Sequence, residues 1–114
     1  MENKLPSHFL RFKQSHPDIY RAFEELGKRV HDGGPLSERE RRLVKLGIAI
    51  GVNTAGGVHS ALRQATSGGC SREDVEHVAL LAITTLGWPR AMAAMSWVFD
   101  GFDETDEVDE PVED

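Results

Sequence analysis

One histidine stands out because it is the only readily titratable side chain in a long, mostly apolar stretch. His59 lies between Leu46 and Leu62, and the residues between these two leucines carry no formal charge. An imidazole that faces a substrate can act as a general acid or base near neutral pH. A histidine in apolar surroundings can equally be a packed structural residue. Both interpretations stay open at this point.

The residues around this histidine are small, which leaves space beside its ring. They are Gly56, Gly57, Ser60 and Ala61. Such space suits a ligand, and it suits close packing between helices equally well. Ala55 and Arg63, four residues away in each direction, cannot form a histidine-based metal pair with His59 on one helix face. We expect no metal and no other cofactor.

An acidic residue upstream could serve the histidine or could serve only its own helix. Glu40 follows Ser37 by three residues, which is the capping-box pattern of a helix N-terminus. In that role its carboxylate stabilises the first turn without any chemistry. A carboxylate within reach of His59 would instead orient the imidazole. The spacing alone does not decide between these roles.

The elements that must position these residues are all expected to be helices. Glycines, prolines and capping residues divide the chain into segments with helical apolar spacing, and no segment alternates in the strand pattern. The expected helices cover residues 7–14, 17–30, 37–50, 55–66, 71–86 and 89–100. The fold class predicted is therefore an all-α, compact bundle of about six helices, forming one domain over residues 1–102.

Two of these helices are apolar in nearly every direction. They cover residues 75–86 and 91–99. A helix that is apolar all round must be buried on all sides, and a domain of this size rarely achieves that alone. We therefore predict a homo-oligomer whose interface includes part of residues 75–99.

The amino-acid composition limits the classes of protein to which this chain can belong. The chain has 114 residues, a net charge of −6 and one cysteine, Cys70, so a disulfide framework within the chain is excluded. Nine acids lie in the last fifteen residues, and residues 103–114 are predicted to form a disordered acidic tail. The sequence shows no signal peptide and no membrane span. We expect a cytoplasmic protein that binds neither membranes nor nucleic acid.

The order of these features resembles the carboxymuconolactone decarboxylase and alkylhydroperoxidase D-like family. The resemblance covers roughly residues 20–99 and rests on two stretches, LSERERRLVKLGIAIG and VNTAGGVHSALRQATSGGCSREDVEHVALLAITTLGWPRAMAAM. It implies the alkylhydroperoxidase D-like helical fold. The thiol peroxidase branch resembles E…CxxCxxxH, which carries its acid onto Glu40 and its histidine onto His59. Its two cysteines fall on Val52 and Ala55, so thiol peroxidase activity is not expected.

The resemblance also implies a chemistry for the cysteine-less branch. Decarboxylation of an unsaturated lactone acid needs a proton donor, and His59 with Glu40 is the catalytic pair that the resemblance implies. A small carboxylate substrate would need a positive group, for which Arg42, Arg63 and Arg90 are candidates. Trp88 could form a wall of the pocket. The leading hypothesis is a cofactor-independent, decarboxylase-like lyase.

Two alternatives remain beside the lyase. The first is a non-catalytic helical oligomer that uses the scaffold for binding or assembly. The second is a relative of the peroxidase branch that has lost its CxxC redox centre. The lyase needs an accessible histidine, whereas the oligomer needs only the apolar helices.

Overall fold

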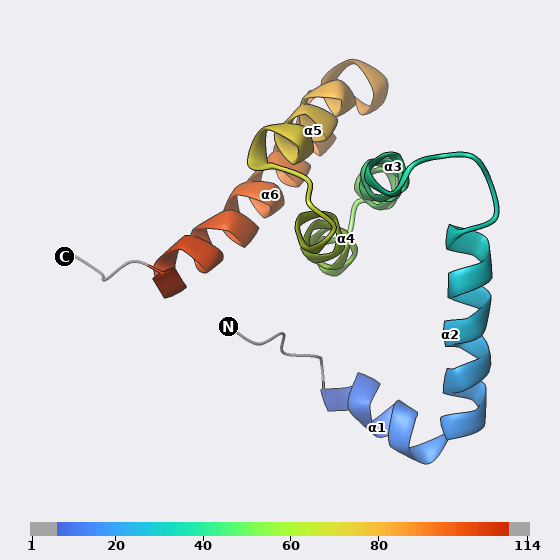
Figure 1. Cartoon of the computed structure of the whole chain (residues 1–114). Coiled ribbons are helices and arrows are strands. Elements are labelled where there is room, and N and C mark those ends of the chain that lie inside the picture. Colours follow the sequence, from blue (N-terminus) through green and yellow to red (C-terminus); the bar gives the residue numbers. More distant parts are fainter. Residues whose placement is uncertain (1–6, 110–114) are drawn as a thin grey trace. The chain divides into compact units, whose positions relative to one another are not determined.

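The computed structural model describes the backbone of residues 7–109 and the side chains of residues 8–102. These residues form six helices, and they contain no strand, so the predicted all-α class is confirmed (Figure 1). The helices are α1 (Ser7–Ser15), α2 (Pro17–His31), α3 (Glu38–Val52), α4 (Ala55–Ser67), α5 (Arg72–Leu86) and α6 (Trp88–Asp109). The expected break between the third and fourth helices shrinks to Asn53 and Thr54, because α3 continues through Val52.

The chain divides into two compact units, Met1–Pro35 and Leu36–Asp114. In the first unit α1 packs against α2, and the rings of Phe9 and Tyr20 meet edge to face with centroids 5.5 Å apart. Helix α2 is strongly amphipathic, yet its apolar residues stay exposed. They are Ile19, Phe23, Leu26 and Val30. The single domain predicted for residues 1–102 stays a prediction.

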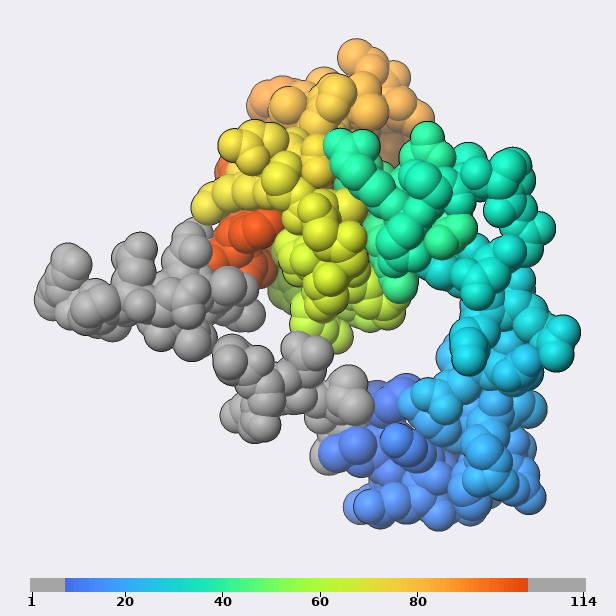
Figure 2. Space-filling model, in the orientation of Figure 1, coloured from blue at the N-terminus to red at the C-terminus, as the bar shows by residue number. Residues whose placement is uncertain are grey.

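The second unit contains α3 to α6 and the hydrophobic core. Helix α4 packs against α3 on one side and against α6 on the other, and α5 also contacts both α3 and α6. Figure 2 shows this order on one face, where α4 lies between the green surface of α3 and the red part of α6. The largest fully buried side chains come from all four helices. They are Leu46, Ile50, Val58, Val75 and Val98.

Local side-chain chemistry explains where these helices begin. Ser37 and Glu40 form the predicted capping box of α3, and Ser71 and Asp74 form the matching box of α5. The hydroxyl of Thr54 accepts the backbone N–H of Gly57, which caps α4. Together these caps satisfy backbone groups that the first turn of a helix leaves without partners.

The turn between α3 and α4 is short because Asn53 takes the left-handed conformation. Its φ is 70°, and its backbone N–H donates to the carbonyl of Ala49. Asparagine tolerates this conformation better than most residues with a side chain, since its short polar group can bond locally. The reversal brings α4 back along α3, so the histidine helix lies against the helix that carries Glu40.

One ion pair joins the N-terminal ends of α3 and α5. The Nη2 atom of Arg39 donates to the Asp74 carboxylate at 2.5 Å. The backbone hydrogen bond from Ser71, followed by the bond from Arg39, lowers the pKa of the Asp74 carboxyl. This carboxylate therefore caps its own helix and also connects it to α3.

The predicted acidic tail lies outside the residues whose side chains the structure describes. Helix α6 extends to Asp109, while the predicted disorder concerns residues 103–114, whose side chains lie outside the described residues. Among the helices that the structure describes, none is long and apolar enough to cross a membrane.

Candidate functional site

His59 lies in the second turn of α4 with its ring half buried. Its Nε2 atom is buried and has no hydrogen-bond partner in the described part of the chain. Buried polar atoms nearly always have a partner, so an exception calls for an explanation such as a catalytic role or a bound water. This Nε2 atom is therefore a candidate for proton exchange with a ligand.

His59 precedes Leu62 by three residues, so the two side chains are neighbours on the surface of α4. Leu62, which is buried next to His59 on the helix surface, has its side chain directly against Gly101 of α6. A Cβ atom at position 101 would lie 2.3 Å from Leu62 Cδ2, so only glycine allows this approach without movement. Arg63 follows His59 by one turn on the same flank and is exposed. His59 and Arg63 therefore lie on the same side of α4, as their spacing in the sequence predicts.

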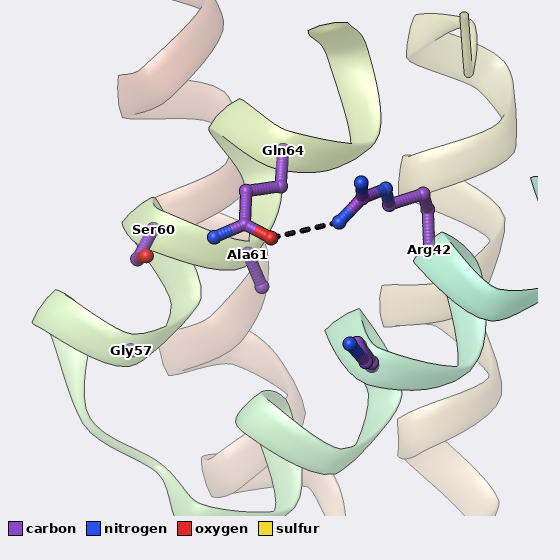
Figure 3. A pocket seen from close by; sticks show the side chains of 6 residues that line it. Arg42, Gly57, Ser60, Ala61 and Gln64 are labelled. Carbon is purple, nitrogen blue, oxygen red and sulfur yellow. Dashed lines mark hydrogen bonds between the residues drawn. The ribbon is translucent and has the colours of Figure 1, made fainter. Parts of the chain in front are cut away.

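A groove of about 310 Å³ lies between α3 and α4. It is lined by Arg42 and Lys45 from α3 and by Gly57, Ser60, Ala61 and Gln64 from α4. Figure 3 shows Arg42 and Gln64 pointing toward one another across the groove, and Ala61 pointing from α4 toward α3. The groove therefore has two cations along one side and small or polar residues along the other.

Arg42 is fixed in this groove by two hydrogen bonds. Its Nε atom donates to a Glu38 carboxylate oxygen at 2.7 Å, and its Nη1 atom donates to Gln64 Oε1 at 2.8 Å. The bond to Gln64 joins α3 to α4, and it holds the guanidinium at the groove. Arg42 was a predicted carboxylate ligand, and the structure places it where a ligand could reach it.

His59 does not line this groove. Successive residues of an α-helix are about 100° apart, which places His59 on the flank beyond Leu62, whereas Ser60, Ala61 and Gln64 face the other flank. The structure thus separates Arg42 from His59, and Arg63 is the candidate arginine that stays on the side of His59.

Glu40 is engaged in the cap of α3 rather than with the histidine. Its carboxylate accepts the backbone N–H of Ser37 at 2.8 Å, and this backbone hydrogen bond is the main cause that lowers the pKa of the Glu40 carboxyl. The bond between Arg42 and Gln64 sets the level at which α3 and α4 face each other. At 1.5 Å per residue, Glu40 then lies roughly 10 Å along α3 from the level of His59.

The structure therefore does not bring Glu40 and His59 together within one chain. The capping function of Glu40 is confirmed by its hydrogen bonds with Ser37. Its predicted function beside the imidazole stays a prediction without support from this geometry.

Trp88 and Arg90 begin the last helix. Trp88 is the first residue of α6 and its side chain is 61% exposed, so it does not form the wall of an enclosed pocket in the described structure. The Nη1 atom of Arg90 lies 3.4 Å from the carbonyl oxygen of Gly51. Among the described residues, neither of them forms a hydrogen bond with His59.

The sequence analysis does not identify two of the polar residues that line the groove, Lys45 and Gln64. Lys45 lies three residues after Arg42, and Gln64 lies four residues after Ser60, so each pair shares a helix face. This spacing could have indicated that each pair shares a helix face. It predicts a shared groove only when the register between α3 and α4 is known.

The positions that carry cysteines in the peroxidase pattern bear aliphatic side chains. Val52 ends α3 and Ala55 begins α4. The only thiol, Cys70, is buried between α4 and α5, and burial raises the pKa of its thiol. Among the residues that the structure describes, no group of three or more His, Cys, Asp or Glu side chains could hold a metal ion.

Comparison with known proteins gives one match. Residues 17–100 match the model of the carboxymuconolactone decarboxylase family. No curated protein and no solved structure matches the chain. The matched range begins at the first residue of α2, ends within α6 and includes His59 and the whole groove. The resemblance predicted from the sequence is confirmed by this match.

Proposed function

This chain belongs to the carboxymuconolactone decarboxylase family, and we propose that it is a cofactor-independent lyase with His59 as the proton-transfer residue. The proposed substrate is a small unsaturated carboxylic acid or lactone acid. The observation that carries the proposal is the buried Nε2 atom of His59, which has no hydrogen-bond partner among the described residues. A general acid or base must come within hydrogen-bond reach of the atom that it protonates. The buried Nε2 atom meets this requirement when a substrate displaces the groups that cover it.

The reaction has one bond to break and one to form. The bond between the substrate's α-carbon and its carboxylate breaks, CO2 leaves, and the electron pair stays on carbon in conjugation with a carbonyl group. Protonated His59 then delivers its proton to that carbon, and it regains a proton from water. Gly56, where an added Cβ would meet nothing within 4 Å, leaves room on α4 near the imidazole for a planar substrate.

Arg63 supplies the positive charge in this proposal. It is exposed one turn beyond His59, so its guanidinium can hold an anionic group of a substrate whose reacting carbon faces the ring. Glu40 has no step in the reaction, because its carboxylate is engaged with Ser37.

The first test is a substrate screen. The purified chain is incubated with unsaturated lactone acids and with β-keto acids, and the released CO2 is measured. We expect CO2 release above the uncatalysed rate with at least one compound of these classes. Release at the uncatalysed rate for every compound would contradict the lyase proposal.

Arg63→Gln should then raise KM by about tenfold or more while kcat changes little. Loss of a charge-assisted hydrogen bond costs about 1.5–3 kcal/mol, and a contact made equally in the ground state and the transition state affects KM alone. Steady-state kinetics on the substrate found in the screen measures both constants. Arg11→Gln, at an exposed arginine of α1, is the matched control and should leave both unchanged. An unchanged KM in Arg63→Gln would exclude this arginine from substrate binding.

A specific observation also favours the second candidate, a helical oligomer with a binding or assembly function. Several large apolar side chains of α5 and α6 remain exposed in the single chain. They are Leu80, Leu81, Trp88 and Phe99. Such side chains are expected to be covered by another copy of the chain, which agrees with the interface that we predict within residues 75–99.

Leu81→Asp tests this interface, since the Leu81 side chain is 57% exposed in the single chain and would be buried in the oligomer. Sedimentation equilibrium at micromolar concentration should show an oligomer for the wild type and a folded monomer for the variant. Leu10→Asp makes the same change on α1, outside the interface, and should stay oligomeric. A well-folded wild-type monomer at this concentration would reject self-association. Oligomerisation without any turnover in the screen would favour the non-catalytic function.

A further inference from the structure

We propose that the groove between α3 and α4 is a binding site for small organic carboxylates that is separate from His59. No step of the proposed lyase reaction uses this groove. Three features of the groove support this site: its size, the way Arg42 is held, and the division between its polar and apolar lining.

The groove is large enough for a small organic acid. Its volume of about 310 Å³ lies at the lower end of the range for ligand pockets. The space exists because α4 presents Gly57 and Ala61 to α3, where longer side chains would fill it. These two residues also give the groove an apolar floor, which suits a hydrocarbon chain and not a bare inorganic ion.

The charge in the groove is positive. The six lining residues include the cations Arg42 and Lys45 and no carboxylate. Glu38 bonds Arg42 from the same helix at 2.7 Å, yet it does not line the groove itself. An anion entering the groove therefore meets two cationic side chains and no lining carboxylate, with the charge of Arg42 partly balanced by its ion pair with Glu38.

Arg42 is held in a conformation that a carboxylate can use. Only its Nε and one N–H of Nη1 are occupied, by Glu38 and Gln64, so its Nη2 atom donates to no described residue. A carboxylate binds best to two neighbouring guanidinium N–H groups, and the edge between Nη1 and Nη2 can supply them. Because its two protein bonds already order the side chain, little conformational entropy remains to be lost on binding.

Two neutral donors complete the set. Gln64 accepts the Arg42 bond through Oε1, which leaves its amide nitrogen as a donor, and Figure 3 shows this nitrogen on the side of Ser60. The Ser60 hydroxyl also lines the groove. Donors on α4 opposite the cations of α3 favour a ligand with more than one oxygen, such as a dicarboxylate.

This site is independent of the catalytic proposal, because neither His59 nor Arg63 lines the groove. Binding can therefore be measured without turnover. The failure of one proposal leaves the other intact.

The test measures binding of succinate, acetate and inorganic phosphate to the full chain by isothermal titration calorimetry and by amide NMR shifts. We expect succinate to bind with a roughly millimolar Kd and to shift the amides of residues 57–64, with acetate binding more weakly. Arg42→Gln and Lys45→Gln should each weaken succinate binding about tenfold or more, since each removes a charged donor. Arg11→Gln, which removes the same charge from α1, should bind succinate like the wild type.

Each alternative outcome overturns the proposal. No succinate binding up to about 50 mM, far above a Kd in the millimolar range, would exclude the site. Equal weakening in Arg42→Gln, Lys45→Gln and Arg11→Gln would show an effect of net charge only. Phosphate binding more tightly than succinate would refute the carboxylate class. Because Arg42→Gln also breaks bonds to Glu38 and Gln64, circular dichroism must show that it is folded, and Lys45→Gln provides the second variant if it is not.

Discussion

His59→Gln is expected to lower kcat about 100- to 10,000-fold, which is the range for loss of a general acid or base. Glutamine keeps a polar group of similar length at this half-buried position, but it cannot carry the proton. The Nε2 atom makes no hydrogen bond with the described residues, so its removal should break no hydrogen bond among them. The measurement is kcat on the substrate found in the CO2 screen, together with thermal unfolding of the variant.

The matched control is His77→Gln, which makes the same change at an exposed histidine of α5. It should keep the activity of the wild type. If His59 were only a packed residue, His59→Gln would instead lower the free energy of unfolding by about 1–3 kcal/mol and leave turnover unchanged. Full activity in His59→Gln would refute the assignment of this residue as the proton donor.

The helices were predictable because their ends carry strong local signals. The Ser37–Glu40 and Ser71–Asp74 pairs announce two capping boxes, and both are present in the structure. Interactions within one turn depend on sequence separation alone, so they can be read without tertiary information. Helix α3 ends two residues beyond the predicted end, because Asn53 and not Gly51 takes the left-handed conformation that terminates it.

The site was harder to predict because it depends on how two helices face each other. Glu40 and His59 lie on neighbouring helices, but the register set by Arg42 and Gln64 places them at different levels. A shift of one helical turn between α3 and α4 would change which residues meet. The pattern of apolar residues places a helix face in the core, and it constrains the sliding of one helix along another only weakly.

The position of Arg42 also depends on how α3 and α4 face each other, which the sequence does not fix. Arg42 is a candidate for the same ligand as the histidine, yet it faces the groove with Lys45, and His59 does not line that groove. The 100° rotation between successive residues of a helix predicts that Ser60 and His59 point in different directions from α4. It could not show which flank of α4 meets α3, because small residues lie on both flanks.

Leu46→Ala is expected to lower the free energy of unfolding by about 2–5 kcal/mol, which is the range for removing a buried leucine. The Leu46 side chain is 0% exposed on α3, and it belongs to the core cluster that includes residues of α4, α5 and α6. Truncation to alanine removes apolar contacts and leaves a cavity that the surrounding helices can close only in part. Urea unfolding followed by circular dichroism measures the change.

Ile48→Ala is the matched control, because it truncates an aliphatic side chain on the same helix where the side chain is 63% exposed. It should change the free energy of unfolding by no more than about 0.5 kcal/mol, as surface substitutions usually do. The difference arises from burial alone, since helix α3, its cap and the type of change are shared. Equal losses in the two variants would mean that Ile48 is as buried in solution as Leu46, and the exposed face assigned to α3 would then be wrong. A small loss in Leu46→Ala would instead mean that the core of the second unit can close around the missing side chain.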